Sequence, residues 1–191
     1  MMRKRTRSAG FTLIELLAVL GVIVLVSTII FANNSRFGGK MVLENLAYEI
    51  ALTIRQVQSY GISVIRFEKT GAFEGAYGIY FNANTNASKK SYVIFADRKP
   101  QSGLRDGKYG GASERIQLVN FNSGYQVNAL YVNDCAVEVK VLQITFERPS
   151  PNAVILGDGA LFDDACIELK SPRRDFTARV HVYRSGQIAV E

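Results

Sequence analysis

An unusual stretch near the N-terminus reads Gly10-Phe11-Thr12-Leu13-Ile14-Glu15-Leu16-Leu17. It opens an apolar run over residues 11–31 in which Glu15 is the only charged residue. A helix of this length spans about 31 Å, which matches the roughly 30 Å hydrocarbon core of a bilayer. Because apolar residues cover every side of such a helix, the pattern is typical of a membrane span and not of an amphipathic surface helix.

The residues before this run carry most of the net charge. The sequence of 191 residues has 23 Lys and Arg against 17 Asp and Glu, a formal net charge of +6. Four basic residues and no acid lie among the first ten positions: Arg3, Lys4, Arg5 and Arg7. The other 181 residues hold 19 basic and 17 acidic groups, so the charge of the body does not indicate a nucleic-acid-binding protein. A basic tail before an apolar span stays in the cytoplasm, which directs the rest of the chain to the far side of the membrane.

Several kinds of N-terminal segment fit part of this pattern. A cleaved secretory signal peptide needs small residues in an A-x-A-like arrangement near the end of the apolar run. Ile30-Phe31-Ala32 has a small residue at only one of the two positions. A plain signal anchor explains every feature except Glu15, because a carboxylate within a span has an insertion cost of a few kcal/mol and is a functional residue by default.

A third interpretation accounts for both the basic leader and the acid. The motif resembles the N-terminus of type IV prepilins, the family of type IV pilins, type II secretion pseudopilins and competence pseudopilins. The resemblance implies that a membrane peptidase cuts between Gly10 and Phe11 and methylates the new amine of Phe11. It also implies that Glu15 pairs with the N-terminal amine of a neighbouring subunit, which relieves a carboxylate in low-dielectric surroundings. We therefore expect a leader at residues 1–10 and a transmembrane and filament-core helix at residues 11–32.

A linker and a second helix are expected over residues 33–62. Residues 33–40 are polar and contain Gly38-Gly39, which predicts a break or a loosening of the helix where the chain leaves the membrane. From residue 41 to 60, apolar side chains recur at steps of three and four and form one stripe, which comprises Leu43, Leu46, Ala47, Ile50, Ile54 and Val57. The stripe predicts a helix packed on a sheet of the same chain, and Gly61 is suited to cap its C-terminus.

The remaining residues, 63–191, are expected to form a β-rich globular head. Short runs rich in Val, Ile, Tyr and Phe predict strands. These runs cover residues 63–67, 77–81, 91–96, 115–120, 126–132, 137–146, 153–156, 166–169, 177–183 and 187–190. The last two should form a hairpin through the turn Arg184-Ser185-Gly186. The predicted fold class is α+β, a long pilin-like N-terminal hydrophobic helix packed on an antiparallel β-sheet head. This layout resembles the H-type minor pseudopilins of type II secretion and their type IV pilus relatives.

Two cysteines, Cys135 and Cys166, lie in the part of the chain that is expected to face an oxidising space. A disulfide between them would close a loop of 30 intervening residues and stabilise the head by about 3 to 4 kcal/mol on the loop-entropy model. Many pilins carry a disulfide in their C-terminal half, so the resemblance favours the bridge. Two buried thiols are the alternative, because a distance cannot be read from a sequence.

Other side chains give little support for catalysis or for a bound metal. One histidine, His181, and two cysteines are too few for a His/Cys zinc site, and we expect His181 on a strand surface. Asp158, Asp163 and Asp164 do not alternate as calcium ligands would, so neither a metal nor a cofactor is predicted. The sequence has no nucleophile elbow and no phosphate-binding loop, so an enzyme is not expected.

A basic patch late in the chain is the one feature that fits nucleic acid. It comprises Arg173, Arg174, Arg179 and Arg184. Such a patch would contact DNA phosphates, as the basic residues of some minor pilins do during DNA uptake. Glu168 and Asp175 dilute its charge, so a solvated face is favoured and nucleic acid is not expected as a partner.

Together these patterns favour a single-pass protein of the inner (cytoplasmic) membrane, with a cytoplasmic N-terminus, a periplasmic or extracellular head, and a place in a filament after assembly. The favoured function is a minor pseudopilin of a type II secretion system. Its partners would be prepilin peptidase, other pseudopilins or pilins, and the membrane before assembly. A minor type IV pilin for adhesion or DNA uptake is the alternative within the filament class. A membrane-anchored β-domain binding protein is the alternative outside it.

Gly10→Ala, or a larger residue at this position, should block removal of the leader, because the resemblance assigns the cut to the bond that follows this glycine. The unsubstituted chain should have methylated Phe11 as its mature N-terminus. Intact mass spectrometry of the membrane fraction measures both outcomes. A mature N-terminus other than Phe11 would contradict the prepilin interpretation, and an uncut chain would favour the membrane-anchored alternative.

Overall fold

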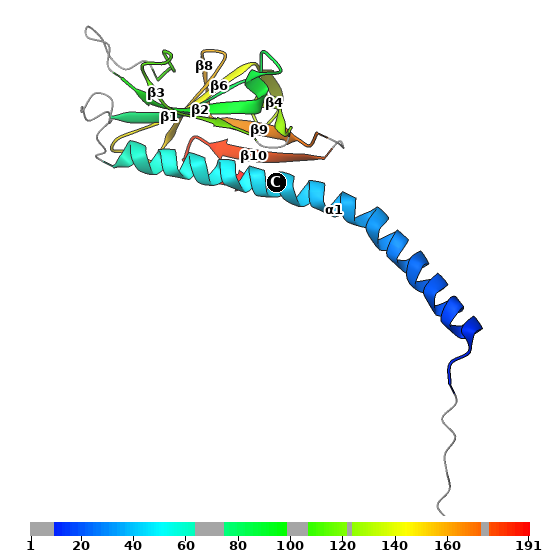
Figure 1. Cartoon of the computed structure of the whole chain (residues 1–191). Coiled ribbons are helices and arrows are strands. Elements are labelled where there is room, and N and C mark those ends of the chain that lie inside the picture. The colour runs from blue at the N-terminus through cyan, green and yellow to red at the C-terminus, as the bar shows by residue number, and fades with distance from the viewer. Residues whose placement is uncertain (1–9, 64–74, 99–106, 122–123, 173–175) are drawn as a thin grey trace, which may run out of the picture. The chain divides into compact units, whose positions relative to one another are not determined.

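The computed structural model describes residues 10–63, 75–98, 107–121, 124–172 and 176–191. The chain divides into two compact units, one that ends at Gly38 and one that begins at Gly39. One long helix, α1 (Leu13–Ile62), contributes to both units, and the described strands all belong to the second. The predicted α+β class is confirmed, since the second unit packs a helix on antiparallel sheets (Figure 1).

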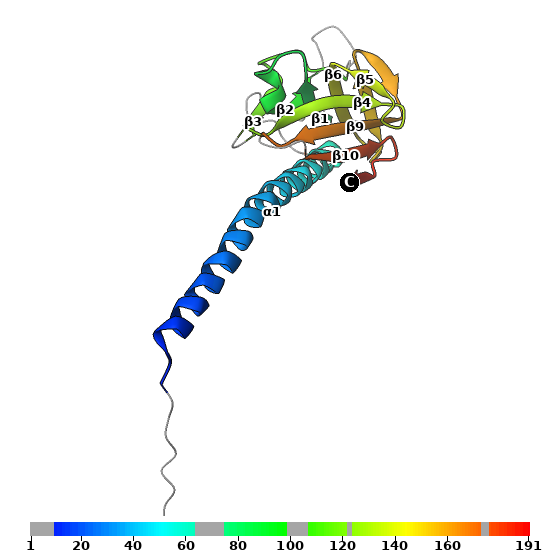
Figure 2. The same ribbon diagram turned by 90° about the vertical axis from the view of Figure 1, so that its right-hand side faces the viewer.

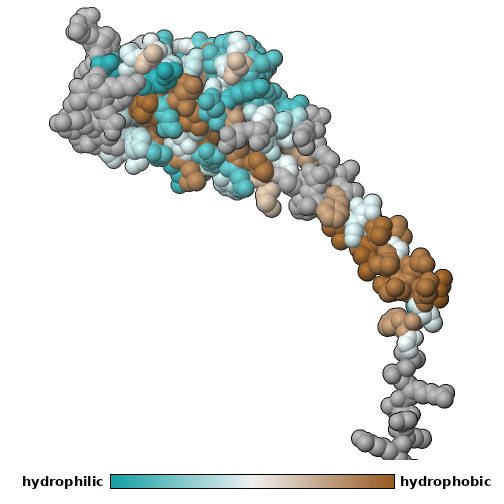
Figure 3. Space-filling view, viewed as in Figure 1, coloured by the Kyte–Doolittle hydropathy of each residue, from teal (hydrophilic) through white to brown (hydrophobic). Residues whose placement is uncertain are grey.

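The first unit contains the apolar part of α1. Its segment Leu13–Phe31 is long and apolar enough to cross a membrane, and none of the residues that the structure describes buries it. Large apolar side chains are exposed along the whole segment, which forms a continuous hydrophobic surface in Figure 3. A helix of this kind requires apolar surroundings that its own chain does not provide.

The polar residues that follow this segment do not end the helix. α1 continues through residues 33–40, so a break is wrong, whereas a loosening of the helix at this place stays a prediction. A glycine in a helix interior costs only about 1 kcal/mol, and the strongly helical segments on both sides outweigh two such costs. The Gly38-Gly39 pair coincides instead with the boundary between the two compact units.

The second part of α1 buries one stripe of side chains in the head, as its periodicity predicts. The residues of this stripe that are at most 1% exposed are Leu43, Ala47, Ile50, Ile54 and Val57. Polar contacts add to this packing in the C-terminal half of the buried part: the Thr53 hydroxyl lies 3.3 Å from the Tyr92 hydroxyl, and the Gln58 side-chain amide donates to the Pro151 carbonyl oxygen at 2.9 Å. Figures 1 and 2 show this part of α1, drawn in cyan, against the strands of the head.

The head contains eleven described strands and one short 3-10 helix, η1 (Ser88–Lys90). The strands are β1 (Ala76–Asn82), β2 (Ser91–Asp97), β3 (Arg115–Asn120), β4 (Gln126–Val132), β5 (Val137–Val139), β6 (Val141–Glu147), β7 (Ala153–Gly157), β8 (Ala160–Phe162), β9 (Asp164–Lys170), β10 (Thr177–Tyr183) and β11 (Ile188–Val190). Each predicted run from residue 77 onward contains a strand. β8 was not predicted, since three residues are too few for an alternating pattern. In the run at 63–67, Ser63 follows α1 in a bend and the other residues lie outside the described part of the chain.

These strands form two antiparallel sheets. One has the order β3-β2-β1-β6-β7-β8, and the other has the order β11-β10-β9-β4-β5. The predicted C-terminal hairpin is confirmed, because Val182 of β10 pairs with Ile188 of β11 and Gly186 in the turn has a φ of +85°. Buried residues of both sheets and of the α1 stripe belong to one hydrophobic core, so the helix completes the core of the head.

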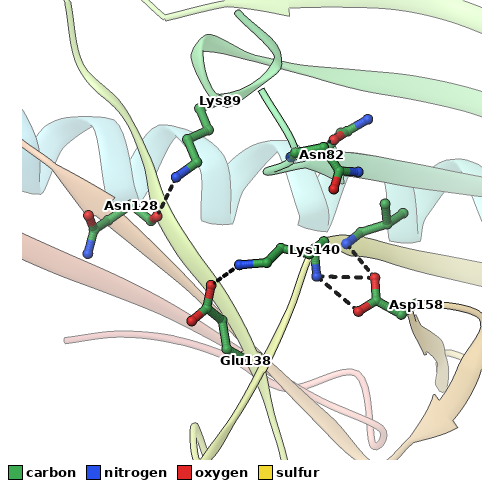
Figure 4. Close-up of polar contacts among 8 residues, drawn as sticks. Asn82, Lys89, Asn128, Glu138, Lys140 and Asp158 are labelled. Atoms are coloured by element: carbon green, nitrogen blue, oxygen red, sulfur yellow. Dashed lines mark hydrogen bonds and ion pairs between the residues drawn. The ribbon is translucent and has the colours of Figure 1, made fainter. Parts of the chain in front are cut away.

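The run at 137–146 was predicted as one strand, but the structure divides it at Lys140. β5 belongs to the five-stranded sheet and β6 to the six-stranded sheet, so the chain changes sheets at this residue. The carboxylate of Asp158 accepts the backbone N–H groups of Lys140 at 3.1 Å and of Val141 at 2.8 Å, which stabilises the corner (Figure 4). The Lys140 ammonium, which contacts Glu138, lowers the pKa of that carboxyl. Local alternation does not reveal the corner, because Asp158 is 18 residues away from Lys140.

Gly61 lies within the last turn of α1 and not beyond it, so its predicted role as a C-terminal cap is wrong. A Cβ at this position would lie 2.5 Å from the carbonyl oxygen and 2.8 Å from the Cβ of Phe146 on β6. The absence of a side chain therefore lets the end of the helix approach the six-stranded sheet closely.

Gly61→Ala should lower the free energy of unfolding by about 1–3 kcal/mol, because the backbone of β6 must move to admit a methyl group. Gly39→Ala is a matched control in the same helix, since its Cβ would lie 3.9 Å from Ser171 Oγ, an ordinary contact. There the helix preference of alanine should raise stability by about 0.5–1 kcal/mol. Denaturant titration of the full chain in detergent measures both, and a stabilising effect at residue 61 would contradict the close approach.

Candidate functional site

The bond predicted to be cut lies in accessible backbone. Gly10, Phe11 and Thr12 are exposed and precede the first residue of α1 without forming helix. Phe11 is 82% exposed, and a Cβ placed on Gly10 would meet no atom within 4 Å. An exposed, non-helical peptide bond is the state that a peptidase can bind, and the structure provides it between Gly10 and Phe11.

The start of α1 is held by reciprocal hydrogen bonds between Thr12 and Glu15. The N–H of Glu15 donates to Thr12 Oγ1 at 3.3 Å, and the N–H of Thr12 donates to Glu15 Oε2 at 3.3 Å. The Thr12 hydroxyl also contacts Glu15 Oε2 at 3.2 Å. The Leu16 N–H donates to the Thr12 carbonyl oxygen at 3.2 Å, which starts the helical hydrogen bonding. This is a capping box, with Thr12 as the N-cap and Glu15 as the third helical residue.

Sequence reasoning assigned Glu15 to assembly and missed its local role, although the T-x-x-E spacing before an apolar run is a readable signal for a capping box. Glu15 also lies in the first turn of α1, where the partial positive charge of the helix N-terminus favours a carboxylate. Both contacts with Thr12 end on Oε2, and Oε1 accepts no hydrogen bond from the residues that the structure describes. One carboxylate oxygen of Glu15 therefore remains available to a group from outside this chain.

The structure joins Cys135 and Cys166 by a disulfide, with the two Cα atoms 5.5 Å apart. Cys135 lies in the turn between β4 and β5, and Cys166 lies on β9, so the bond links this turn to the neighbouring strand. The turn is unusual because Asn133, Asp134 and Cys135 have left-handed φ values of 54°, 56° and 60°. Non-glycine residues adopt this conformation at a cost, so the cross-link holds a turn that the backbone alone disfavours.

His181 is not a surface residue, so the expected exposed position is wrong. It is 4% exposed, its Nε2 lies 3.0 Å from Oδ2 of Asp164, and its ring stacks on Tyr183 at a centroid distance of 4.1 Å. Alternation along β10 places this side chain on the outer face of the sheet, but it cannot predict that neighbours on that face cover it. Asp164 also accepts the backbone N–H of Asp134 at 3.0 and 2.9 Å, which connects it to the turn before Cys135.

The described arginines of the late basic patch are paired with acids. Arg179 Nη2 lies 2.7 Å from Oε2 of the buried Glu168, which raises the pKa of the guanidinium. Arg184 Nη1 lies 2.7 Å from Asp163 Oδ1. Arg173 and Arg174 lie outside the described residues. The two pairs reduce the positive charge that this part of the surface can offer to a phosphate backbone.

Comparison with known proteins bears on the N-terminal segment alone. Residues 5–31 match the family model of the prokaryotic N-terminal methylation motif. The matched residues include the bond between Gly10 and Phe11, the capping box and the apolar part of α1. No curated protein and no solved structure matches the chain.

Thr12→Val should loosen the first turn of α1, because valine has the shape of threonine but cannot accept the Glu15 N–H. Loss of an N-cap costs about 0.5–2 kcal/mol. We expect faster exchange of the Glu15 amide, by about 2- to 30-fold, in NMR of the chain in detergent micelles. Thr12→Ser keeps the hydroxyl and should retain the protection, whereas unchanged protection in Thr12→Val would contradict the capping role.

Proposed function

We propose that this chain, which carries the N-terminal methylation motif of type IV prepilin-like proteins, is a minor pseudopilin of a type II secretion system. The leader is removed after Gly10, Phe11 becomes a methylated N-terminus, and α1 joins the core of a filament. The function is assembly, and no catalytic step is assigned to the chain. The motif match over residues 5–31 is the observation that carries the proposal.

The exposed apolar surface of Leu13–Phe31 supports two successive environments for α1. Before assembly, lipid surrounds this segment, with the basic leader on the cytoplasmic side. After assembly, the apolar segments of neighbouring subunits replace the lipid. Because both environments are apolar, the transfer does not require this surface to enter water.

The geometry of Glu15 supports its proposed role in assembly. Removal of the leader creates an ammonium group at Phe11, and a neighbouring subunit can present this group to the carboxylate. Thr12 uses Oε2 of Glu15, so Oε1 can accept the ammonium group while the capping box stays formed. The pairing would be strong, since a charged donor and acceptor meet in apolar surroundings and each otherwise lacks a counter-ion there.

The architecture of the head supports the H-type assignment by layout. A long helix followed by a β-rich head, with two antiparallel sheets and a C-terminal hairpin, is the order expected for this class. The head would lie in the periplasm before assembly, where an oxidising environment maintains the Cys135–Cys166 bond.

Glu15→Gln separates assembly from capping. Glutamine at the third helical position can still accept from Thr12, so the first turn should remain intact, but the charge for the neighbouring ammonium group is lost. We expect normal leader removal and at least a tenfold lower amount of the protein in sheared filaments, measured by quantitative mass spectrometry. Glu15→Leu should be at least as poorly incorporated, because it removes the charge and the cap. Normal incorporation of Glu15→Gln would contradict the proposed pairing.

Deletion of the gene in its host assigns the filament system. Loss of protein secretion with intact pili is the expected result, and the protein should co-purify with other pseudopilins. Normal secretion together with loss of adhesion or DNA uptake would contradict the secretion assignment and favour a minor type IV pilin.

A further inference from the structure

Three metal-ligating side chains meet on the outer face of the five-stranded sheet. The two sulfur atoms of Cys135 and Cys166 and a ring nitrogen of His181 all lie within 4.8 Å of one another. The sheet register produces this arrangement, because His181 on β10 is directly opposite Cys166 on β9. The disulfide brings Cys135 to the same place from the turn between β4 and β5.

Asp164 connects these groups. Its Oδ2 lies 3.0 Å from His181 Nε2, and its carboxylate accepts the N–H of Asp134, the residue next to Cys135. A carboxylate bonded to one nitrogen of an imidazole fixes the tautomer and leaves the other nitrogen able to bind a metal.

We propose that reduction of the Cys135–Cys166 disulfide converts this cluster into a site for Zn²⁺ or a similar thiophilic cation. A dithiol transfers two electrons and two protons to the disulfide and becomes a disulfide itself, which leaves Cys135 and Cys166 as thiols. Binding of Zn²⁺ then releases the two thiol protons. The ligands are the two thiolates and His181, with a water molecule in the fourth position, and Asp164 orients the His181 ring.

The dimensions of the cluster fit a tetrahedral site. Zinc binds sulfur at about 2.3 Å and nitrogen at about 2.0–2.1 Å, so neighbouring ligand atoms lie about 3.5–3.8 Å apart. The sulfur atoms must separate by less than 2 Å from bonding distance, as estimated from these lengths. Cys135 can supply this movement, because it lies in a turn and is only partly buried, whereas Cys166 and His181 are fixed on buried strand positions.

One histidine and two cysteines are too few for a closed zinc site, which needs four protein ligands, if His and Cys are the only ligands. The fold adds Asp164 as a residue that orients His181: it pairs with Tyr183, two residues along from the His181–Cys166 pair on the same two strands. A bound cation would tie the β4–β5 turn to β9 and β10 when the disulfide is open. The site would therefore replace a covalent link by a metal link at the same place in the head.

The site is tested with Co²⁺, whose absorption reports thiolate ligands, on the full chain in detergent. Protein reduced with a phosphine, which is oxidised to its oxide, should bind one equivalent of Co²⁺ with a thiolate charge-transfer band that Zn²⁺ abolishes. Oxidised protein should show no such band. A reduced chain with native circular dichroism and no thiolate band would overturn the proposal.

Variants test His181 as a ligand and Asp164 as the residue that orients it. His181→Phe keeps a ring against Tyr183 and should weaken Co²⁺ binding at least tenfold. Asp164→Asn should weaken it about tenfold, in the range measured for groups that orient metal ligands. Asp163→Asn is the matched control, since Asp163 contacts Arg184 outside the cluster, and its affinity should stay within about twofold of the unsubstituted chain.

Unchanged affinity in His181→Phe would overturn the proposal, because the two thiols alone would then account for binding. If the reduced chain loses its β-sheet circular dichroism, restoration of that signal by Zn²⁺ supports the site. A reduced chain that stays unfolded with Zn²⁺ refutes it.

Discussion

A helix that is apolar on every side must be shielded from water over its whole surface, and this requirement divides the chain into its two units. Leu13–Phe31 is left uncovered by the described part of the chain, whereas the later part of α1 needs cover on one face only and obtains it from the head. The boundary falls at Gly38-Gly39, within the polar residues that separate the segment apolar on all sides from the segment with one apolar stripe. The head therefore supplies hydrophobic burial in one unit, whereas the other requires lipid or other subunits.

The apolar segment can contain one acid, Glu15, because this residue lies in the first turn of α1. At the third position of α1, Glu15 accepts the backbone N–H of Thr12, which no helical partner can reach, and it meets the positive end of the helix dipole. Four residues further along the helix, the same carboxylate would have neither benefit. A position in the first turn thus gives Glu15 local stability while one of its oxygen atoms remains available for an external cation.

Much of the fold was predictable because local patterns carry it. The stripe of α1 follows from apolar residues at steps of three and four, and most strands follow from apolar residues at alternate positions. Both patterns depend only on which side chains must be buried away from water. What escaped prediction depends on distant partners. Glycine is required at residue 61 because α1 approaches Phe146 closely there. Asp158 stabilises the corner at Lys140, and neighbours on β9 and β10 bury His181. In the candidate site, Gly10, Phe11 and Glu15 belong to a motif that is visible in the sequence. The hydrogen bonds between Thr12 and Glu15 follow from a separate signal, the T-x-x-E spacing of a capping box.

The burial of the α1 stripe also constrains how a subunit can enter a filament. Leu43, Ile50, Ile54 and Val57 are almost fully buried, and burial of side chains of this size contributes about 1.5–3 kcal/mol each. Together they approach the net stability of a whole domain, about 5–15 kcal/mol. The head therefore cannot release the helix and remain folded, because the core that both sheets share would open. A subunit that enters an assembly through its N-terminal segment must then bring a folded head with it, since the same helix, α1, contains that segment and completes the core of the head.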